Sequence, residues 1–286
     1  MQPGITNKAF AVVHLVWLPF GIELFRSFVA SYQAHNPGCD HDLVIVFNGV
    51  SKEADTAVYH AHLVECGIRY SSYILSSGQD ITAYRWAASQ LDHTYLLFLN
   101  SYCRLLAGNW GACYLNAIRT DNAGAVSATG SWQSYYSSVF TMNRWGWEKS
   151  KTFHENFRKY KLFVKAAMYW RFLFRAFPNP HLRTNAFIIK RELFLSIACP
   201  PLRNKFAAYL FESGKNGLSG ELLRRGYELL VVDRNGVIYK KNEWKASATF
   251  WIKAQENLLV SDNRTRMYDE AGQDEKAVMT RLAWGL

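Results

Sequence analysis

The feature that most constrains this fold is the alternation of strand-like and helix-like segments over the first hundred residues. Three of the strand-like segments are apolar runs, typical of strands buried on both faces of a sheet, and a fourth alternates in polarity. Gly, Asn or Asp bounds the helical segments between them. The predicted strands are 8–17, 42–47, 68–75 and 95–99, and the predicted helices are 21–35, 52–66 and 80–91. This order predicts an α/β fold with a mostly parallel sheet flanked by helices.

The pattern loosens after Gly130, where residues 132–147 are aromatic and Ser-rich and are predicted to form a loop with short strands. The chain has 286 residues and is 49% hydrophobic, which suffices for one large core. No internal repeat or low-complexity linker divides it. We therefore predict a single domain over residues 1–286 with a decorated C-terminal half. Its further predicted helices are 157–177, 191–197 and 218–225, and its further strands are 187–190 and 228–232.

The charge distribution limits the classes of partner that suit this chain, and the cysteine pattern limits its redox compartment. Residues 1–150 carry a net charge of −1 and the remainder +11, so the whole excess of +10 lies in the second half. Nucleic acid, anionic lipid and phosphorylated substrates all suit such an excess. The five scattered cysteines form neither a CxxC pair nor a Cys/His cluster, which disfavours zinc and indicates a reducing compartment. We find no signal peptide and no apolar stretch of about 18 residues, and so expect no transmembrane helix.

Polar or small residues follow each predicted strand of the first half, at the edge where open α/β sheets bind ligands. Asn100 and Ser101 end a buried strand, which favours a ligand role over a structural one. Asn48 fits either a base contact or an Asn-Gly turn, and Asp80 fits either a ribose or base contact or a helix N-cap. His14, inside an apolar strand, fits a core position. Neither G-x-G-x-x-G nor G-x-x-x-x-G-K-[ST] is present, which disfavours dinucleotide and P-loop sites.

The order of these segments resembles the GT-A fold of inverting glycosyltransferases. The resemblance rests on five stretches between residues 8 and 233: AVVHLVW, LVIVFNGVS, SSGQDITAYRWAASQLDHTYLLFLNSY, HLRTNAFIIKRELF and FESGKNGLSGELLRRGYELLVVD. In that family the first two line the nucleotide, and the third ends in a Leu-Asp-x-Asp motif. The last two resemble the acceptor-side strand and the segment that holds the catalytic base. The Leu-Asn-Ser variant of the motif is similar to that of a subset of polysaccharide-building transferases.

The resemblance implies a role for each half of the domain. Residues 131–286 would bind the acceptor through His181, Arg183, Thr184 and Asn185. Inverting transfer needs a base that deprotonates the acceptor hydroxyl, and Glu212 stands in the corresponding segment, with Glu221 as the runner-up. Residues 1–130 would bind a nucleotide-sugar donor, and the residues implied are Val16, Asn48, Gly49, Asp80, Asn100, Ser101 and Tyr102.

The acidic motif of the family is replaced here by Asn100-Ser101-Tyr102. All three residues are neutral, whereas Mg²⁺ and Mn²⁺ prefer anionic oxygen ligands. We therefore predict no metal ligands, and a divalent cofactor, although compatible with the family, is disfavoured. Cationic or hydroxyl donors then have to meet the charge of the leaving diphosphate. The candidates are Arg104, Arg183 and Lys215.

Residues 157–177 form a basic aromatic segment with six Lys or Arg, eight aromatic residues and no acid. In a helical projection five of the cations share one arc, and the other side is aromatic and aliphatic. This pattern is typical of a helix in an anionic membrane interface, and equally of a surface helix packed on its own sheet. Nucleic acid is a weaker alternative, since no recognised motif accompanies the segment. The five cations are Arg158, Lys161, Lys165, Arg171 and Arg175.

Together these features predict a glycosyltransferase that moves a hexosyl group from a nucleoside-diphosphate donor to a saccharide hydroxyl. We expect its acceptor to be a saccharide or a lipid-linked glycan in bacterial-type surface polysaccharide or glycolipid assembly. The expected place is the cytoplasm, with peripheral attachment to the inner face of the membrane. Two alternatives stay open. One is a nucleotidyltransferase, which normally demands metal carboxylates, and the other is a non-catalytic basic module that binds nucleic acid or anionic lipid.

Overall fold

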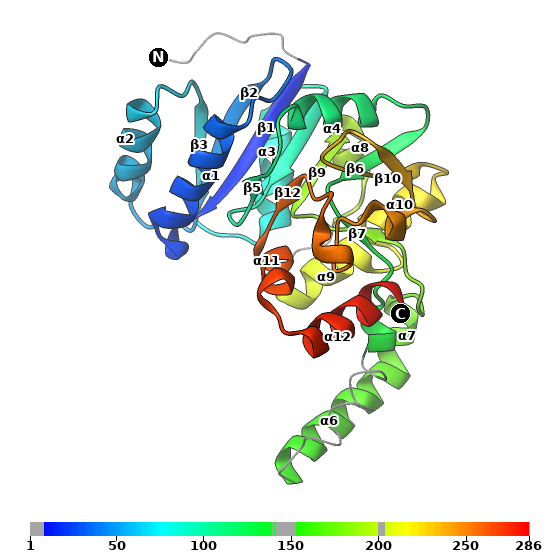
Figure 1. The fold of residues 1–286 in the computed structure, drawn as a ribbon. Helices are drawn as coiled ribbons and strands as arrows, with labels where there is room; N and C mark the ends of the chain where they lie inside the picture. The colour runs from blue at the N-terminus through cyan, green and yellow to red at the C-terminus, as the bar shows by residue number, and fades with distance from the viewer. Residues whose placement is uncertain (1–8, 139, 141–152, 200–203, 286) are drawn as a thin grey trace.

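A computed structural model describes residues 9–138, 140, 153–199 and 204–285 (Figure 1). One eight-stranded sheet runs through them in the order β11-β10-β6-β9-β4-β1-β2-β3. Six strands run one way, and β9 and β11 run the other way. The mostly parallel sheet predicted from the sequence is thereby confirmed. Its strands are β1 (Phe10–Trp17), β2 (Asp42–Asn48), β3 (Ser71–Leu75), β4 (Tyr95–Leu99), β6 (Ala123–Ser127), β9 (Ala186–Lys190), β10 (Glu228–Val232) and β11 (Ile238–Lys240).

Helices cover both faces of the sheet, because its central strands are apolar on both sides. In β1, Val13 and Leu15 enter one buried cluster, and Val12 and Val16 enter the other. The first cluster lies under α3 (Asp80–Gln90), α8 (Arg191–Ser196), α9 (Lys205–Ser213), α10 (Leu218–Arg224), α11 (Asn263–Glu270) and α12 (Gln273–Trp284). The second lies under α1 (Ile22–Ala34), α2 (Ala57–Glu65) and α4 (Trp110–Ile118). His14 is fully buried in β1, as the sequence predicts.

Most segments predicted in the first half are confirmed to within a few residues. The predicted helix 52–66 divides into a 3-10 turn (Glu53–Thr56) and α2. The predicted helix 157–177 is wrong at both ends, because α6 (Phe153–Lys165) starts earlier and the helix ends with α7 (Arg171–Leu173) after a π turn (Ala166–Trp170). Much of the predicted loop at 132–147 lies outside the described residues.

Two small ribbons bring distant segments to the carboxyl edge of the parallel strands. β12 (Val260–Ser261) pairs with β5 (Arg104–Leu105), just after the β4 loop. β8 (His181–Leu182) pairs with β7 (Gly130–Ser131). Because β9 is antiparallel to β4, its amino end meets the carboxyl end of β4, with Ala186 opposite Leu99. Residues 181–185, which precede β9, therefore lie at the ligand edge of the sheet.

Candidate active site

The loop after β4 is held by its own polar side chains. Asn100 Oδ1 accepts hydrogen bonds from the backbone N–H of Tyr102 (3.0 Å) and from Cys103 Sγ (3.3 Å). Regular pairing of β1 with β4 ends at His14. Beyond it, Ser101 Oγ donates to Leu15 O and accepts from Trp17 N, both at 2.9 Å. The Ser101 hydroxyl thus makes the hydrogen bonds to the end of β1 that the backbone of a neighbouring strand would otherwise make. The side chains of residues 100 and 101 are engaged in shaping this edge, which leaves Tyr102 as the half-buried side chain of the triplet.

Asn48 and Gly49 form a turn at the end of β2. The Asn48 carboxamide donates to Gly78 O and accepts from Gly49 N, both at 2.9 Å, and the residue is fully buried. The amide thus positions the Gly78 loop, and a direct base contact through it would need these bonds to break. Gly49 has φ 76°, and a Cβ there would lie 2.8 Å from the Trp17 ring. The side chain of Val16 is buried in the core under α1, so only its backbone is available to a ligand.

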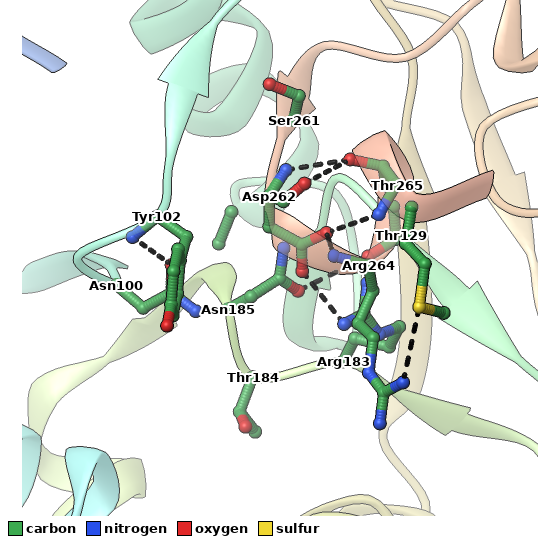
Figure 2. A network of polar contacts seen from close by, with 12 residues as sticks. Asn100, Tyr102, Thr129, Arg183, Thr184, Asn185, Ser261, Asp262, Arg264 and Thr265 are labelled. Carbon is green, nitrogen blue, oxygen red and sulfur yellow. Dashed lines mark hydrogen bonds and ion pairs between the residues drawn. The ribbon is translucent and has the colours of Figure 1, made fainter. Parts of the chain in front are cut away.

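A buried ion pair stands beside the Asn100–Tyr102 loop that follows β4 (Figure 2). Arg183 Nη2 lies 2.8 Å from Asp262 Oδ2, and the side chains are 13% and 0% exposed. Asp262 also caps α11, since its Oδ1 accepts from the N–H groups of Arg264 and Thr265. Burial alone would raise the pKa of Asp262, but the charge of Arg183 and these hydrogen bonds outweigh it and lower the pKa. The Arg183 guanidinium also stacks over the Phe250 ring at 4.5 Å.

Two buried donors next to this pair have no hydrogen-bond partner within the described part of the chain. They are Arg183 Nη1 and Asn185 Nδ2. Asn185 is 5% exposed and lies between the Asn100–Tyr102 loop and the ion pair (Figure 2). Its backbone oxygen accepts from Asn100 N at 2.9 Å, which fixes it against β4. Buried donors without acceptors are costly, so this arrangement suits an anionic or carbonyl oxygen from a ligand.

Further positive charge lies behind the loop. Arg266 Nη1 donates to Tyr102 O at 3.1 Å and to Ser261 Oγ at 3.3 Å. Partial burial lowers the pKa of Arg266 first, and the neighbouring charge of Arg104 lowers it further. Arg104 is held by Ser27 Oγ at 3.3 Å. The site is therefore rich in guanidinium groups rather than in carboxylates.

Glu212 lies on the opposite side of the 181–185 segment. It belongs to α9, a helix that the sequence did not predict. Its Oε2 accepts from Thr184 N at 2.8 Å and from Thr184 Oγ1 at 2.6 Å. No hydrogen bond reaches its Oε1 from the described residues. Glu212 is partly exposed, so this second carboxylate oxygen is available to a ligand.

Two other titratable groups feel the charge of Glu212. Burial lowers the pKa of His181, and Glu212 opposes that effect. His181 Nδ1 lies 2.8 Å from the Asn179 carbonyl oxygen, so it donates there and leaves Nε2 as an acceptor. Partial desolvation raises the pKa of Asp80, and the charge of Glu212 raises it further. Asp80 is the first residue of α3, whereas the N-cap is Gln79.

Two candidates from the sequence are engaged elsewhere. Glu221 is ion-paired with Arg224 and Arg225, and the hydrogen bond from Arg225 is the main cause of its lowered pKa. A salt-bridged carboxylate is a poor base, so the geometry favours Glu212. Lys215 Nζ donates to Arg171 O at 2.7 Å, at the root of the long helix, and does not join the guanidinium group around Tyr102.

An open pocket of about 280 Å³ lies at the carboxyl ends of β1 and β2. Gly49, named from the sequence, is part of its wall. Four other lining residues were not identified: Leu18, Pro19, Asp55 and Tyr59. Asp55 is exposed and holds its own loop by accepting from Lys52 N at 3.0 Å.

The donor set does not fit a divalent metal at the family's motif position. Asn100 Oδ1 and Ser101 Oγ are occupied by the protein, and Tyr102 offers a neutral phenol whose pKa is raised by burial and then by Asp80. Guanidinium groups surround the loop, and a cation would be repelled by them. Within the described ranges no three His, Cys, Asp or Glu side chains gather into one cluster.

The sequence did not identify Asp262 or Arg266. Arg266 contacts Tyr102 across 164 residues. Such a contact leaves no local signal, although Asp262 with Thr265 makes a capping box that indicates a helix start. The described residues contain no helix with the length and apolar character needed to cross a bilayer.

No model of a known protein family matches this sequence, and no curated protein matches it. Among solved structures, the chain is similar to GalNAc-T7 with UDP, GalNAc and Mn²⁺, at 13% identity and a TM-score of 0.48, over 95% of this chain and 51% of that one. It is also similar to the mannosyltransferase PcManGT from Pyrobaculum calidifontis with GDP-Man and Mn²⁺, at 13% identity and a TM-score of 0.33, over 43% and 35%. A third is S. aureus TarS 1–349 with UDP-GlcNAc, at 11% identity and 0.32, over 41% and 33%. This chain spans about half or less of each of them.

Proposed function

We propose that this chain is a GT-A-type glycosyltransferase that moves a hexosyl group from a nucleoside-diphosphate sugar to a saccharide hydroxyl. The observation that carries the proposal is the cluster at the carboxyl edge of the sheet. Buried, unpartnered donors of Arg183 and Asn185 lie on one side of the 181–185 segment, and the Glu212 carboxylate lies on the other. Departure of a diphosphate needs the first, and activation of a hydroxyl needs the second.

The nucleoside belongs in the open pocket beside Gly49. Its volume of about 280 Å³ is close to the lower end of the ligand-pocket range. Gly49 lets the chain turn at the wall of this pocket without a side chain striking the Trp17 ring, and Asp55 offers a carboxylate oxygen to a base or ribose donor group. Asp80, at the start of α3, is a second candidate for the ribose. Asn48 acts indirectly, by holding the Gly78 loop.

The diphosphate belongs between the Asn100–Tyr102 loop and Arg183. Arg183 Nη1 and Asn185 Nδ2 are oriented by their other contacts, so little reorganisation is needed when charge develops on the leaving oxygen. Arg266 and Arg104 add positive potential behind Tyr102. We infer that these groups meet the leaving-group charge without a metal. A nucleotidyltransferase is less well supported, because its chemistry normally demands metal carboxylates.

Glu212 is the proposed base. In the transfer step the acceptor oxygen bonds to the anomeric carbon while the bond from that carbon to the phosphate oxygen breaks. The acceptor proton passes to Glu212 Oε1, and the nucleoside diphosphate leaves with the electron pair. Thr184 fixes the carboxylate through Oε2, and His181 Nε2 is placed to accept a hydrogen bond from an acceptor hydroxyl. Attack opposite to the leaving group gives inversion. A saccharide chain of a surface polysaccharide or glycolipid is the proposed acceptor.

A donor screen followed by a matched pair of variants tests the proposal. We expect UDP, GDP or one of their sugars to raise the melting temperature in the presence of EDTA. With that donor, Glu212→Gln should lower turnover on the order of 100- to 10,000-fold and leave donor affinity largely unchanged. The control is Glu221→Gln, which changes an ion-paired glutamate nearby and should retain turnover. No stabilisation by any nucleotide, or equal turnover in both variants, would contradict the proposal.

A further inference from the structure

The long basic helix is an arm that stands off the body of the protein (Figure 1). α6, the π turn and α7 run without a break from Phe153 to Leu173, a length of about 30 Å at 1.5 Å per residue. Of the two structures that the sequence left open, the helix packed along its own sheet is thus wrong for α6.

The arm exposes far more apolar surface than a soluble helix in water normally does. Tyr169 is 71% exposed, Met168 65% and Phe172 64%, and Phe157 and Tyr160 are each at least half exposed. Phe157 with Tyr160, and Met168 and Tyr169 with Phe172, are three or four positions apart on one continuous helix, so they are neighbours on its surface rather than scattered single residues. A patch of this kind marks a contact surface.

Charge selects the partner. The cations Arg158, Lys161, Lys165, Arg171 and Arg175 are all exposed, and residues 157–177 contain no acid. A second copy of the arm would carry the same charges and be repelled. An acidic bilayer offers opposite charge to the cations and an apolar interior to the aromatic rings. We propose that residues 157–173 dock on an anionic membrane surface, with the helix lying in the interface.

The root of the arm transmits this docking to the body. Trp170 packs on Tyr135 and Phe206, at 4.7 and 5.8 Å between ring centroids. The backbone N–H of Lys215 donates to Leu173 O at 2.8 Å, and its ammonium donates to Arg171 O. Lys215 follows closely after α9. The arm is thus attached rigidly beside the helix that carries Glu212, and a docked arm brings that edge of the protein close to the bilayer. The docking itself does not depend on glycosyl transfer.

Vesicle co-sedimentation of the full chain tests the proposal. We expect binding to phosphatidylcholine vesicles that contain phosphatidylglycerol, and little binding to phosphatidylcholine alone. Each cation near an acidic surface is worth about a fivefold change in affinity at low salt. Lys161→Gln with Lys165→Gln should therefore weaken binding about 30-fold. Tyr169→Ser with Phe172→Ser should weaken binding to the acidic vesicles by the same factor at low and at high salt, because salt does not screen the burial of aromatic rings.

The matched control removes two exposed cations outside the arm, Arg69→Gln with Lys240→Gln, and should bind as the parent does. All these positions are exposed, so melting temperatures should stay unchanged, and that measurement separates lost docking from misfolding. Equal binding to neutral and acidic vesicles, or equal loss in the control, overturns the proposal. So does an arm-dependent affinity for duplex DNA or RNA without affinity for vesicles, which would assign the surface to nucleic acid.

Discussion

His14 makes a specific prediction about acid stability. The residue is fully buried, and its ring stacks on Phe28 with 3.6 Å between ring centroids. Neither ring nitrogen has a hydrogen-bond partner among the described residues. Burial lowers its pKa from 6.5 to about 3. Between these two values the unfolded chain binds a proton on His14 and the folded chain does not. Stability contributed by the neutral ring is therefore present above about pH 6.5 and is lost as the pH falls.

The size of this effect follows from the shift. One pKa unit is worth about 1.36 kcal/mol, so lowering the pH from 7 to 4.5 should remove about 2.5 kcal/mol through His14 alone. His14→Phe keeps an aromatic ring on Phe28 and cannot take up a proton. Its free energy of unfolding should fall about 2.5 kcal/mol less than that of the parent over the same interval. Any packing cost of the larger ring is common to both pH values and cancels.

Urea unfolding at pH 7 and pH 4.5 measures the difference, provided that the m-value does not change. Parallel losses of stability in His14→Phe and the parent would refute the reasoning, since they would show that a proton reaches His14 in the folded state without cost.

Three further predictions concern the site. Asp262→Asn retains a cap for α11 but leaves Arg183 buried without its counter-ion, so we expect a loss of about 3–5 kcal/mol in the free energy of unfolding. Adding Arg183→Met should recover part of that loss. A loss below about 1 kcal/mol in Asp262→Asn would contradict a tight ion pair. Ser101→Ala removes two bonds to the end of β1 and should cost about 1–3 kcal/mol, measured by urea unfolding, whereas unchanged stability would return Ser101 to a ligand role. Transfer activity should survive EDTA at least in part, and complete loss that Mn²⁺ restores would show that a metal is required.

The fold could be predicted where local sequence decides it. Three of the first four strands are apolar runs that can only be buried, and their order constrained the sheet. β6 was missed because its sequence, AGAVS, is small and weakly patterned, and α4 was missed with it. α9, α11 and α12 were missed because they are short or polar and are stabilised by tertiary packing.

The candidate site could be predicted only in part. The segment 181–185 and Glu212 were identified through a resemblance, and the structure brings them together through Thr184. Ser101 was interpreted as ligand-binding because a polar residue at a buried strand end needs a reason, and Asn48 was left between a base contact and an Asn-Gly turn. In the structure both side chains bond neighbouring backbone groups, and Asn48 with Gly49 forms that turn. Which backbone groups need a side-chain partner depends on which strands are adjacent in the sheet, and a single sequence does not show the strand order.

The antiparallel direction of β9 explains why these pieces meet. A parallel strand in its place would send residues 181–185 to the opposite edge of the sheet, away from Gly49 and Tyr102. Reversal also places Ala186 opposite Leu99, so the last residue before β9 lies against the first residue after β4. Arg183 and Asn185 lie beside the β4 loop (Figure 2). Thr184, between them in the turn, donates to Glu212 on α9. One reversed strand thus brings the proposed anion-binding donors and the proposed base to the same edge of the sheet.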